Sequence, residues 1–321
     1  MGKEYKDNDP HWERRTVTEL AWAGLKEQRR ARRWGVFFKI LTFAYLAVFL
    51  MLMLDLPGAK ELPGKDHTAV IKLKGLIADG TAAGSEKINK LLRTAFEDKK
   101  TRGVVLEINS PGGTPVEAVS IYDEIRRLRK EYPDIKLYAV VRDLCASGGY
   151  YIASAADEIY ANESSIVGSI GVRMDGFGFE ALMTKLGIER RTITAGKNKA
   201  LLDPFKPEDP AQRAHVQAML EQVHQKFIDD VKAGRGDRLK PTEDMFSGLI
   251  WSGKSALDLG LIDGFADTQT VAREQIGVEH LVTYEAKKTL LKQLADDVGG
   301  VTASALKKLW TEQAGEPILL R

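Results

Sequence analysis

The sequence predicts an α/β fold in which helices flank a stacked, largely parallel sheet, preceded by one transmembrane helix. Three observations lead to this prediction. Segments of strand and helix character alternate from residue 69 onward, a Gly-rich turn follows two of the strand segments, and an uncharged apolar stretch precedes them all. With 321 residues, 44% of them hydrophobic, the chain has room for one large domain or two small ones.

The first predicted element is the transmembrane helix, over residues 34–54. Its last fifteen residues carry no charge, and its length of about 21 residues is enough to cross a bilayer core. Seven Lys or Arg lie in residues 14–33 and four in residues 55–74, so the positive-inside rule predicts a cytoplasmic N-terminus. Residues 1–33 then form a basic cytoplasmic tail, mostly disordered or lying on a surface. A cleaved signal peptide is the alternative, but no Ala-x-Ala site follows the apolar stretch.

A linker with several Pro and Gly over residues 55–67 leads to a domain predicted over residues 68–285. Its segments are, in chain order, strand 69–77, helix 85–97, strand 103–108, helix 115–130, strand 136–141, helix 147–155, and short strands near 158–160 and 168–172. Apolar residues at helical spacing predict a further helix over 210–232, and we interpret their stripe as a packing face. Residues 286–321 are predicted to be a helical C-terminal extension.

Composition and residue placement exclude several classes of function. The net charge of +2 gives no support to nucleic-acid binding. The single Cys145 excludes an intramolecular disulfide, and we interpret it as a small buried apolar residue rather than a nucleophile. His215 and His224 fall on opposite faces of one predicted helix, which is wrong for a shared metal ion. For a Ser-His-Asp triad, the sequence leaves His280 open, but no Asp or Ser motif frames it. We therefore expect no metal and no cofactor.

The candidate chemistry lies where two predicted strands end. A turn with adjacent glycines, ending at Gly113, follows the strand over 103–108, and Ser147 opens a helix together with Gly148 after the next strand. Adjacent glycines let the backbone approach a substrate, and amides at a helix N-terminus point at negative charge. Ser147 is the candidate nucleophile, and the amides of Gly113 and Gly148 are the candidate oxyanion donors. The alternative is that both are Gly-rich turns that merely end buried strands.

A serine nucleophile needs a base, and Lys199 is the candidate. An amine acts as a base only when it is neutral, and desolvation in an apolar pocket lowers the pKa of a lysine. The residues that follow Lys199, over 200–205, are largely apolar, and Ser169 is the best placed hydroxyl to orient the amine. Most lysines are simply solvated, and we expect this of the neighbouring Lys197.

One further motif would by itself indicate nucleotide binding. Residues 248–255 match the phosphate-binding pattern G-x-x-x-x-G-K-[ST]. A phosphate loop has to follow a buried strand, whereas residues 240–246 are polar and helix-like. We therefore expect no nucleotide at this place.

Four ordered motifs resemble those of the signal peptide peptidase A family over about residues 68–266. They are Asn109-Ser110-Pro111-Gly112-Gly113, Ala146-Ser147-Gly148-Gly149-Tyr150-Tyr151, Gly168-Ser169-Ile170-Gly171-Val172, and Thr194-Ala195-Gly196-Lys197-Asn198-Lys199 with Asp203-Pro204-Phe205. The resemblance implies a fold shared with Clp protease and crotonase. It also implies the roles of nucleophile for Ser147, general base for Lys199, lysine-orienting hydroxyl for Ser169, and oxyanion donors for Gly113 and Gly148.

The resemblance also implies an assembly and a location. The chain carries one copy of the motifs, as do half-length members that form rings in which neighbouring protomers complete each site. We therefore expect a homo-oligomer, an octamer, with Ser147 and Lys199 apart within one protomer. We expect it to degrade cleaved signal peptides and other small unfolded or apolar peptides from the bacterial inner membrane, with membrane lipid around its anchor and its catalytic domain outside the cytoplasm. A crotonase-like acyl-CoA enzyme and a non-catalytic membrane scaffold are the alternatives.

Overall fold

The computed structural model describes residues 12–53 and 65–285. Three predicted segments therefore lie wholly or partly outside the described residues. These are the start of the basic tail, most of the linker over 55–67, and the helical extension predicted over 286–321.

A single helix, α1, runs from Trp12 to Met53 without interruption. Of the two forms expected for residues 1–33, mostly disordered or lying on a surface, the helix differs from the first. Ala, Leu, Glu, Gln, Lys and Arg make up much of this stretch and favour helices, and no proline interrupts it. Among the described residues, no helix is both long enough and apolar enough to span a membrane. The side chains of residues 50–54, at the end of the predicted span, lie outside the described ones.

Within the described residues, 65–285 form a compact unit built on one sheet of eight strands. The strands run in the order β6-β5-β3-β2-β1-β8, while β4 pairs with β3 and β7 pairs with β4. Among the described strands, only β5 and β6 pair antiparallel. Their bounds are β1 His67–Lys74, β2 Thr101–Ser110, β3 Lys136–Ala146, β4 Glu158–Ala161, β5 Ile166–Gly168, β6 Ile250–Ser252, β7 Gly264–Phe265 and β8 Leu281–Tyr284.

Strand β3 pairs with two different strands along one of its edges. Its first half pairs with β4 over Tyr138 to Val140, and its last residues pair with β5 over Leu144 to Ala146. The chain thus leaves the end of β3 between β2 and β5. This parallel-dominated α/β architecture fits the expected Clp protease and crotonase-like fold.

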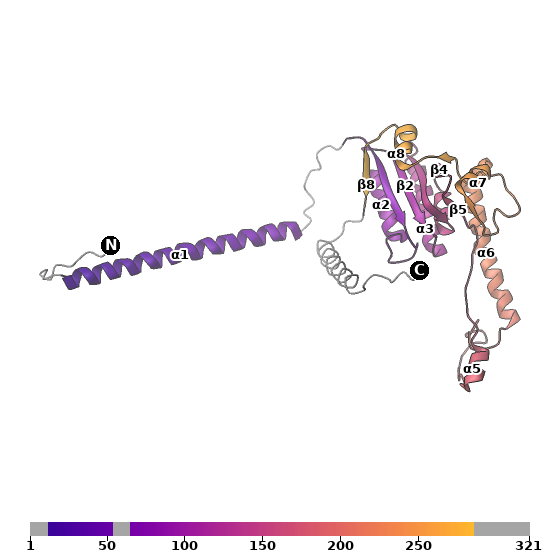
Figure 1. Cartoon of the computed structure of the whole chain (residues 1–321), viewed down its shortest axis with the longest axis horizontal. Coiled ribbons are helices and arrows are strands. Elements are labelled where there is room, and N and C mark those ends of the chain that lie inside the picture. The colour runs from indigo at the N-terminus through magenta and orange to yellow at the C-terminus, as the bar shows by residue number, and fades with distance from the viewer. Residues whose placement is uncertain (1–11, 54–64, 286–321) are drawn as a thin grey trace, which may run out of the picture. The chain divides into compact units, whose positions relative to one another are not determined.

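Four helices enclose the main core, and the first three of them cover one face of the sheet (Figure 1). They are α2 Ser85–Glu97, α3 Pro115–Glu131, the short α4 Gly148–Ala153, and α6 Pro210–Arg235, which packs against α4. The apolar face of α2 shows the usual spacing, because Ile88, Leu92 and Ala95 are all fully buried. A smaller cluster on the other face packs Val70, Val105, Tyr138 and Val140 against Val271 of α8, Thr268–Val271.

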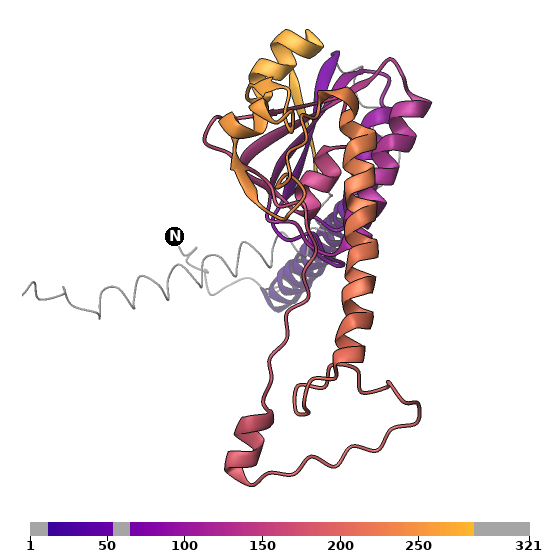
Figure 2. The same cartoon turned by 90° about the vertical axis from the view of Figure 1, so that its right-hand side faces the viewer.

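Between β5 and α6 the chain leaves the body of the unit. Residues 173–209 and the first turns of α6 project together as an arm, whose outer end carries α5, Glu180–Leu186 (Figure 2). The two limbs of the arm are joined by aromatic side chains, because the rings of Phe179 and Phe205 stack with centroids 5.6 Å apart. The guanidinium of Arg190 lies over the Phe205 ring at 4.9 Å.

Most predicted elements are present, with two differences at glycines. Helix 85–97 has the predicted bounds, but strand 69–77 ends at Lys74, where Gly75 turns the chain with a φ of 87°. The strand predicted near 168–172 is wrong. Strand β5 covers Ile166–Gly168, and the φ of 107° at Gly168 directs the chain away from the sheet.

Candidate active site

Ser147 stands on a strained turn between a strand and a helix. Its φ is 52° and its ψ is −122°, a backbone conformation that residues with a Cβ rarely adopt. The turn is fixed from both sides, because the Ser147 N–H donates to the Gly168 carbonyl at 2.8 Å and the Tyr151 N–H donates to the Ser147 carbonyl at 2.9 Å. Strain that is held in place in this way is characteristic of a functional position.

The turn after β2 lies directly against Ser147. The Ser110 hydroxyl donates to the Gly75 carbonyl at 2.6 Å and accepts from the Gly112 N–H at 3.1 Å. A Cβ on Gly112 would lie 2.7 Å from the Gly148 nitrogen and 2.8 Å from the Ser147 Cβ, so only glycine fits there. The two glycine turns predicted from the sequence are therefore in contact.

The two candidate oxyanion donors lie side by side. A Cβ built on Gly148 would be 3.3 Å from the Gly113 nitrogen. The Gly113 amide has no hydrogen-bond acceptor within the part of the chain that the structure describes, and the Gly148 amide is in the first turn of α4, where helix amides lack a partner within the helix. Both N–H groups are thus available to an oxygen beside Ser147.

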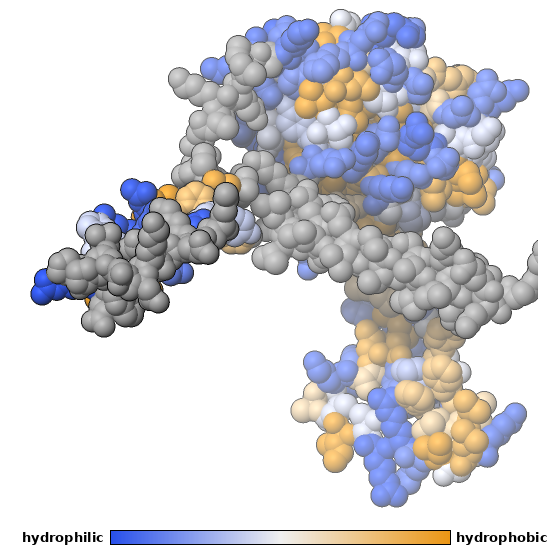
Figure 3. Space-filling model, turned by 60° about the vertical axis from the view of Figure 1, so that its left-hand side comes forward, coloured by the Kyte–Doolittle hydropathy of each residue, from blue (hydrophilic) through white to orange (hydrophobic). Residues whose placement is uncertain are grey.

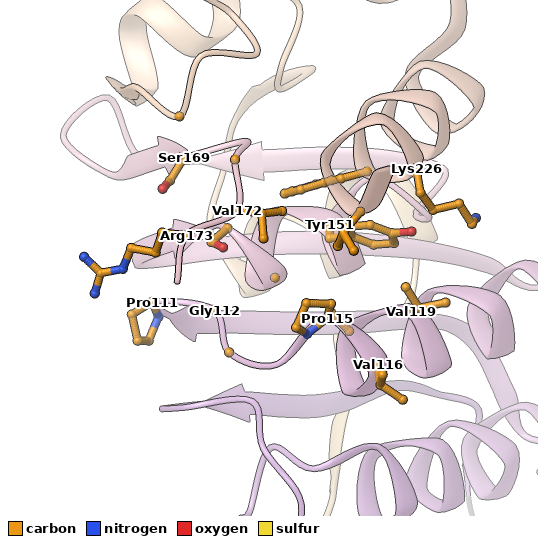
Figure 4. A pocket seen from close by; sticks show the side chains of 18 of the residues that line it. Pro111, Gly112, Pro115, Val116, Val119, Tyr151, Ser169, Val172, Arg173 and Lys226 are labelled. Atoms are coloured by element: carbon orange, nitrogen blue, oxygen red, sulfur yellow. The ribbon is translucent and has the colours of Figure 1, made fainter. Parts of the chain in front are cut away.

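Ser147, Gly113, Gly148 and Ser169 all line one cavity of about 1060 Å³. Figure 4 shows this cavity with Ser169 labelled. Ser169 enters it from the other side, held by a hydrogen bond of 2.7 Å from its N–H to the Leu249 carbonyl. Its φ of 54° is also in the left-handed region. Four of the five predicted site residues are therefore brought together.

Lys199, the fifth, is not among the cavity-lining residues. It lies on the arm with an exposed side chain, and its N–H donates to the Gly196 carbonyl at 3.1 Å. Gln212 at the start of α6 holds this loop, through contacts to the Asn198 side chain at 3.5 Å and the Leu202 N–H at 3.3 Å. Within one chain, the nucleophile and the predicted base do not meet.

Helix α6 contributes a wall of the cavity that the sequence did not identify. Val223, Lys226 and Phe227 all line the cavity. The apolar stripe of this helix was interpreted as a packing face only, and the stripe does pack, since Phe227 and Val231 are buried. Apolar residues at this spacing can pack in a core or line a cavity, and no local signal in the sequence distinguishes the two.

The structure also describes the two other groups considered from the sequence, Cys145 and the phosphate-loop pattern. Cys145 is fully buried, which raises the pKa of its thiol well above the usual value, so it stays protonated. The phosphate-loop pattern forms strand β6 and the six-residue helix α7, Gly253–Asp258. Its amides are already engaged, because the N–H groups of Gly253 and Lys254 donate to the carbonyls of Ser165 and Glu163.

Comparison with known proteins finds matches to one family of peptidases. The model of peptidase family S49 matches residues 129–279. The chain is 31% identical over 269 residues to a Synechocystis sp. protein named as an inferred protease, covering 78% of this chain and 95% of that protein. It is 30% identical over 260 residues to the chloroplastic serine protease SPPA of Arabidopsis thaliana, covering 76% of this chain and 38% of that protein.

A higher identity, 45% over 213 residues, links the chain to an Na(+)/H(+) antiporter NhaA of Brucella abortus. That match covers 65% of this chain but only 29% of the Brucella protein. The chain therefore spans less than a third of that relative, whose name describes the whole protein.

A serine on a strained turn beside two adjacent backbone amides, on a parallel-dominated α/β sheet, is an arrangement that serine peptidases use to hold a nucleophile beside its oxyanion donors. The chain belongs to peptidase family S49, the signal peptide peptidase A family.

Proposed function

We propose that the protein is a membrane-anchored serine endopeptidase that degrades remnant signal peptides and other small unfolded or apolar peptides. The observation that carries this proposal is the strained Ser147 in a cavity beside the amides of Gly113 and Gly148. The cavity suits an extended, apolar peptide, because its lining includes apolar side chains of α3 and α6, namely Val116, Val119, Val223 and Phe227.

The proposed reaction is acyl transfer through a Ser-Lys dyad. Neutral Lys199 takes the proton from the Ser147 hydroxyl while the serine oxygen attacks a peptide carbonyl carbon. The amides of Gly113 and Gly148 stabilise the oxyanion, and the protonated lysine then gives its proton to the leaving amine as the peptide bond breaks. Water hydrolyses the acyl-enzyme and regenerates the serine. Ser169 orients the lysine amine.

The dyad is tested by hydrolysis of an apolar fluorogenic peptide. Ser147→Ala and Lys199→Ala are each expected to lower kcat/KM by about a thousandfold or more, with Lys197→Ala as the matched control that retains activity. Wild-type rates in either dyad variant would contradict the mechanism. Turnover of an acyl-CoA thioester without peptide cleavage would favour a crotonase-like enzyme, and absence of Ser147 labelling by a β-lactone would favour a non-catalytic scaffold.

We propose further that a neighbouring protomer supplies Lys199 in a homo-octameric ring. The exposed position of Lys199 on the arm supports this, as do apolar side chains that are exposed on the arm among polar ones (Figure 3). Phe177 is 78% exposed and Ile193 is 100% exposed, which is unusual for isolated monomers and typical of association surfaces.

A mixing experiment tests the shared site. Ser147→Ala and Lys199→Ala protomers are each inactive alone, but a ring of both can pair an intact serine of one with an intact lysine of the other. Random co-assembly is expected to restore about a quarter of the wild-type sites. Mixed rings that are as inactive as each parent would show that both residues act from the same protomer.

Residues 34–54 are proposed as the membrane anchor, with the N-terminus in the cytoplasm and the catalytic domain on the other side of the bacterial inner membrane. The uncharged stretch and the preceding basic residues support it. In spheroplasts, external protease is expected to digest the catalytic domain and spare a tag before residue 12. Digestion of the tag alone would contradict this topology.

A further inference from the structure

The cavity extends beyond Ser147 into a pocket between α3 and α6. Its walls are apolar, with Val116 and Val119 from α3 and Val223 and Phe227 from α6. Because this pocket is continuous with Ser147, it is suited to hold the side chain of the residue whose carbonyl the serine attacks.

Tyr151 of α4 forms the floor of this pocket, and it is rigidly held. Its ring lies 4.6 Å from that of Phe227 and 5.2 Å from that of Tyr122, measured between centroids. Its hydroxyl donates to the Asp230 carboxylate, and burial together with this hydrogen bond raises the pKa of Tyr151 far above its usual value. The floor is therefore a neutral, hydrogen-bonded phenol.

Among the described residues that line this end of the cavity, Lys226 is the cation. Lys226 lines the pocket beside Tyr151 and Val119, and its Nζ lies 2.5 Å from the Asp230 Oδ2 (Figure 4). Asp230 also accepts from Tyr151, and its side chain is only 15% exposed, against 56% for Lys226. A substrate side chain that reaches this end meets the ammonium before it meets the carboxylate.

The other charged side chains that line the cavity, those of Arg173 and Asp175, lie far from Lys226. Arg173 stands at the opposite end, beyond Ser169 (Figure 4). Asp175 is paired with it at 3.5 Å, and both side chains are highly exposed. Neither can neutralise a second cation placed next to Lys226, because exposed charges are screened over about 8 Å at physiological ionic strength.

We propose that Lys226 is a specificity-determining residue that excludes lysine and arginine side chains from this pocket. This rests on the proposed peptidase function and defines its substrate class further. An apolar side chain packs between the valines and Tyr151 without meeting a like charge, whereas a cationic one brings its charge against the Lys226 ammonium in a partly desolvated site. Signal peptides would therefore be cut within their apolar stretches and not after their basic residues.

The experiment uses two peptides that differ only at the residue before the scissile bond, norleucine in one and lysine in the other. These side chains have similar length and differ by the ammonium. The wild-type enzyme is expected to show at least about a tenfold higher kcat/KM for norleucine, and Lys226→Met is expected to reduce this ratio about tenfold. Lys226→Glu is expected to reverse it.

Lys232→Met is the matched control, because Lys232 lies on the same helix with its ammonium over the Phe246 ring, 5.4 Å from the centroid, and does not line the cavity. It should keep the wild-type ratio. An unchanged ratio in both Lys226 variants, with Ser147-dependent cleavage retained, would overturn the role of Lys226. Absence of Ser147-dependent cleavage of either peptide by the wild type would instead contradict the peptidase proposal itself.

Discussion

At the scale of single residues, the site depends on backbone positions that tolerate no side chain. Gly112 has a φ of 99° and lies against both Ser147 and the Gly148 amide. The amide of Gly113 is presented by the same turn, so this turn aligns one proposed oxyanion donor with the other. An oxyanion hole works only when its donors are fixed in advance at hydrogen-bonding distance.

We expect Gly112→Ala to lower kcat/KM by about a hundredfold or more, because its Cβ would displace Ser147 or the Gly148 amide. Peptide hydrolysis measures the loss, and circular dichroism checks the fold. Gly176→Ala is the matched control, since nothing lies within 4 Å of its Cβ position. A fully active Gly112→Ala enzyme would show that the turn does not align the donors.

At the scale of elements, an ion pair joins α2 to α3. The Glu124 side chain is 8% exposed and accepts from Arg93 of α2 at 2.6 Å and from Arg127 at 2.8 Å and 3.0 Å. The hydrogen bonds from Arg127, followed by those from Arg93, lower the pKa of Glu124 from 4.5 to about 2. The unfolded chain therefore binds more protons between these two values, and stability falls as the pH falls through them.

We expect Glu124→Gln to lower the free energy of unfolding by about 2 kcal/mol at pH 7. The difference from wild type should stay constant down to about pH 4.5 and shrink as the pH approaches 2, since wild-type Glu124 is then protonated too. Urea unfolding at several pH values measures it. Glu131→Gln removes a half-exposed partner of the same Arg127 and should cost less than about 1 kcal/mol. A difference that persists at pH 2 would contradict the ionic origin.

At the scale of the whole molecule, the arm separates the proposed base from the nucleophile. Several of its apolar side chains are exposed, among them Phe177, Leu186 and Ile193. The proposed ring would bury them and bring Lys199 to another protomer's cavity. Catalysis would then require assembly.

We expect Phe177→Glu and Ile193→Glu to lower both the assembled mass and the peptidase activity, because each places a charge on a surface that has to be buried. Light scattering in detergent and peptide hydrolysis measure the two effects together. Phe265→Glu is the control, since Phe265 is 41% exposed on β7 outside the arm. A monomeric variant with full activity would disprove the shared site.

The sequence predicted the parts of the site that lie at strand ends. Ser147 and Gly113 each follow a parallel strand, and the ends of neighbouring parallel strands meet at one edge, so their proximity follows from the pattern. The α6 wall could not be predicted, because Val223 and Phe227 show the same spacing as core residues. The arm could not be predicted either, since Phe177 and Phe179 resemble core residues until the backbone shows that they leave the sheet.

The burial of Cys145 has a practical consequence for measurement. The chain contains one cysteine, and it is fully buried, so a thiol reagent meets no native target on the folded surface. A cysteine introduced at Ile193 on the arm or at Lys226 beside the cavity would carry one spin label or fluorophore per protomer. Distances between arms and cavities across an assembly thus become accessible to spectroscopy without first removing any native residue.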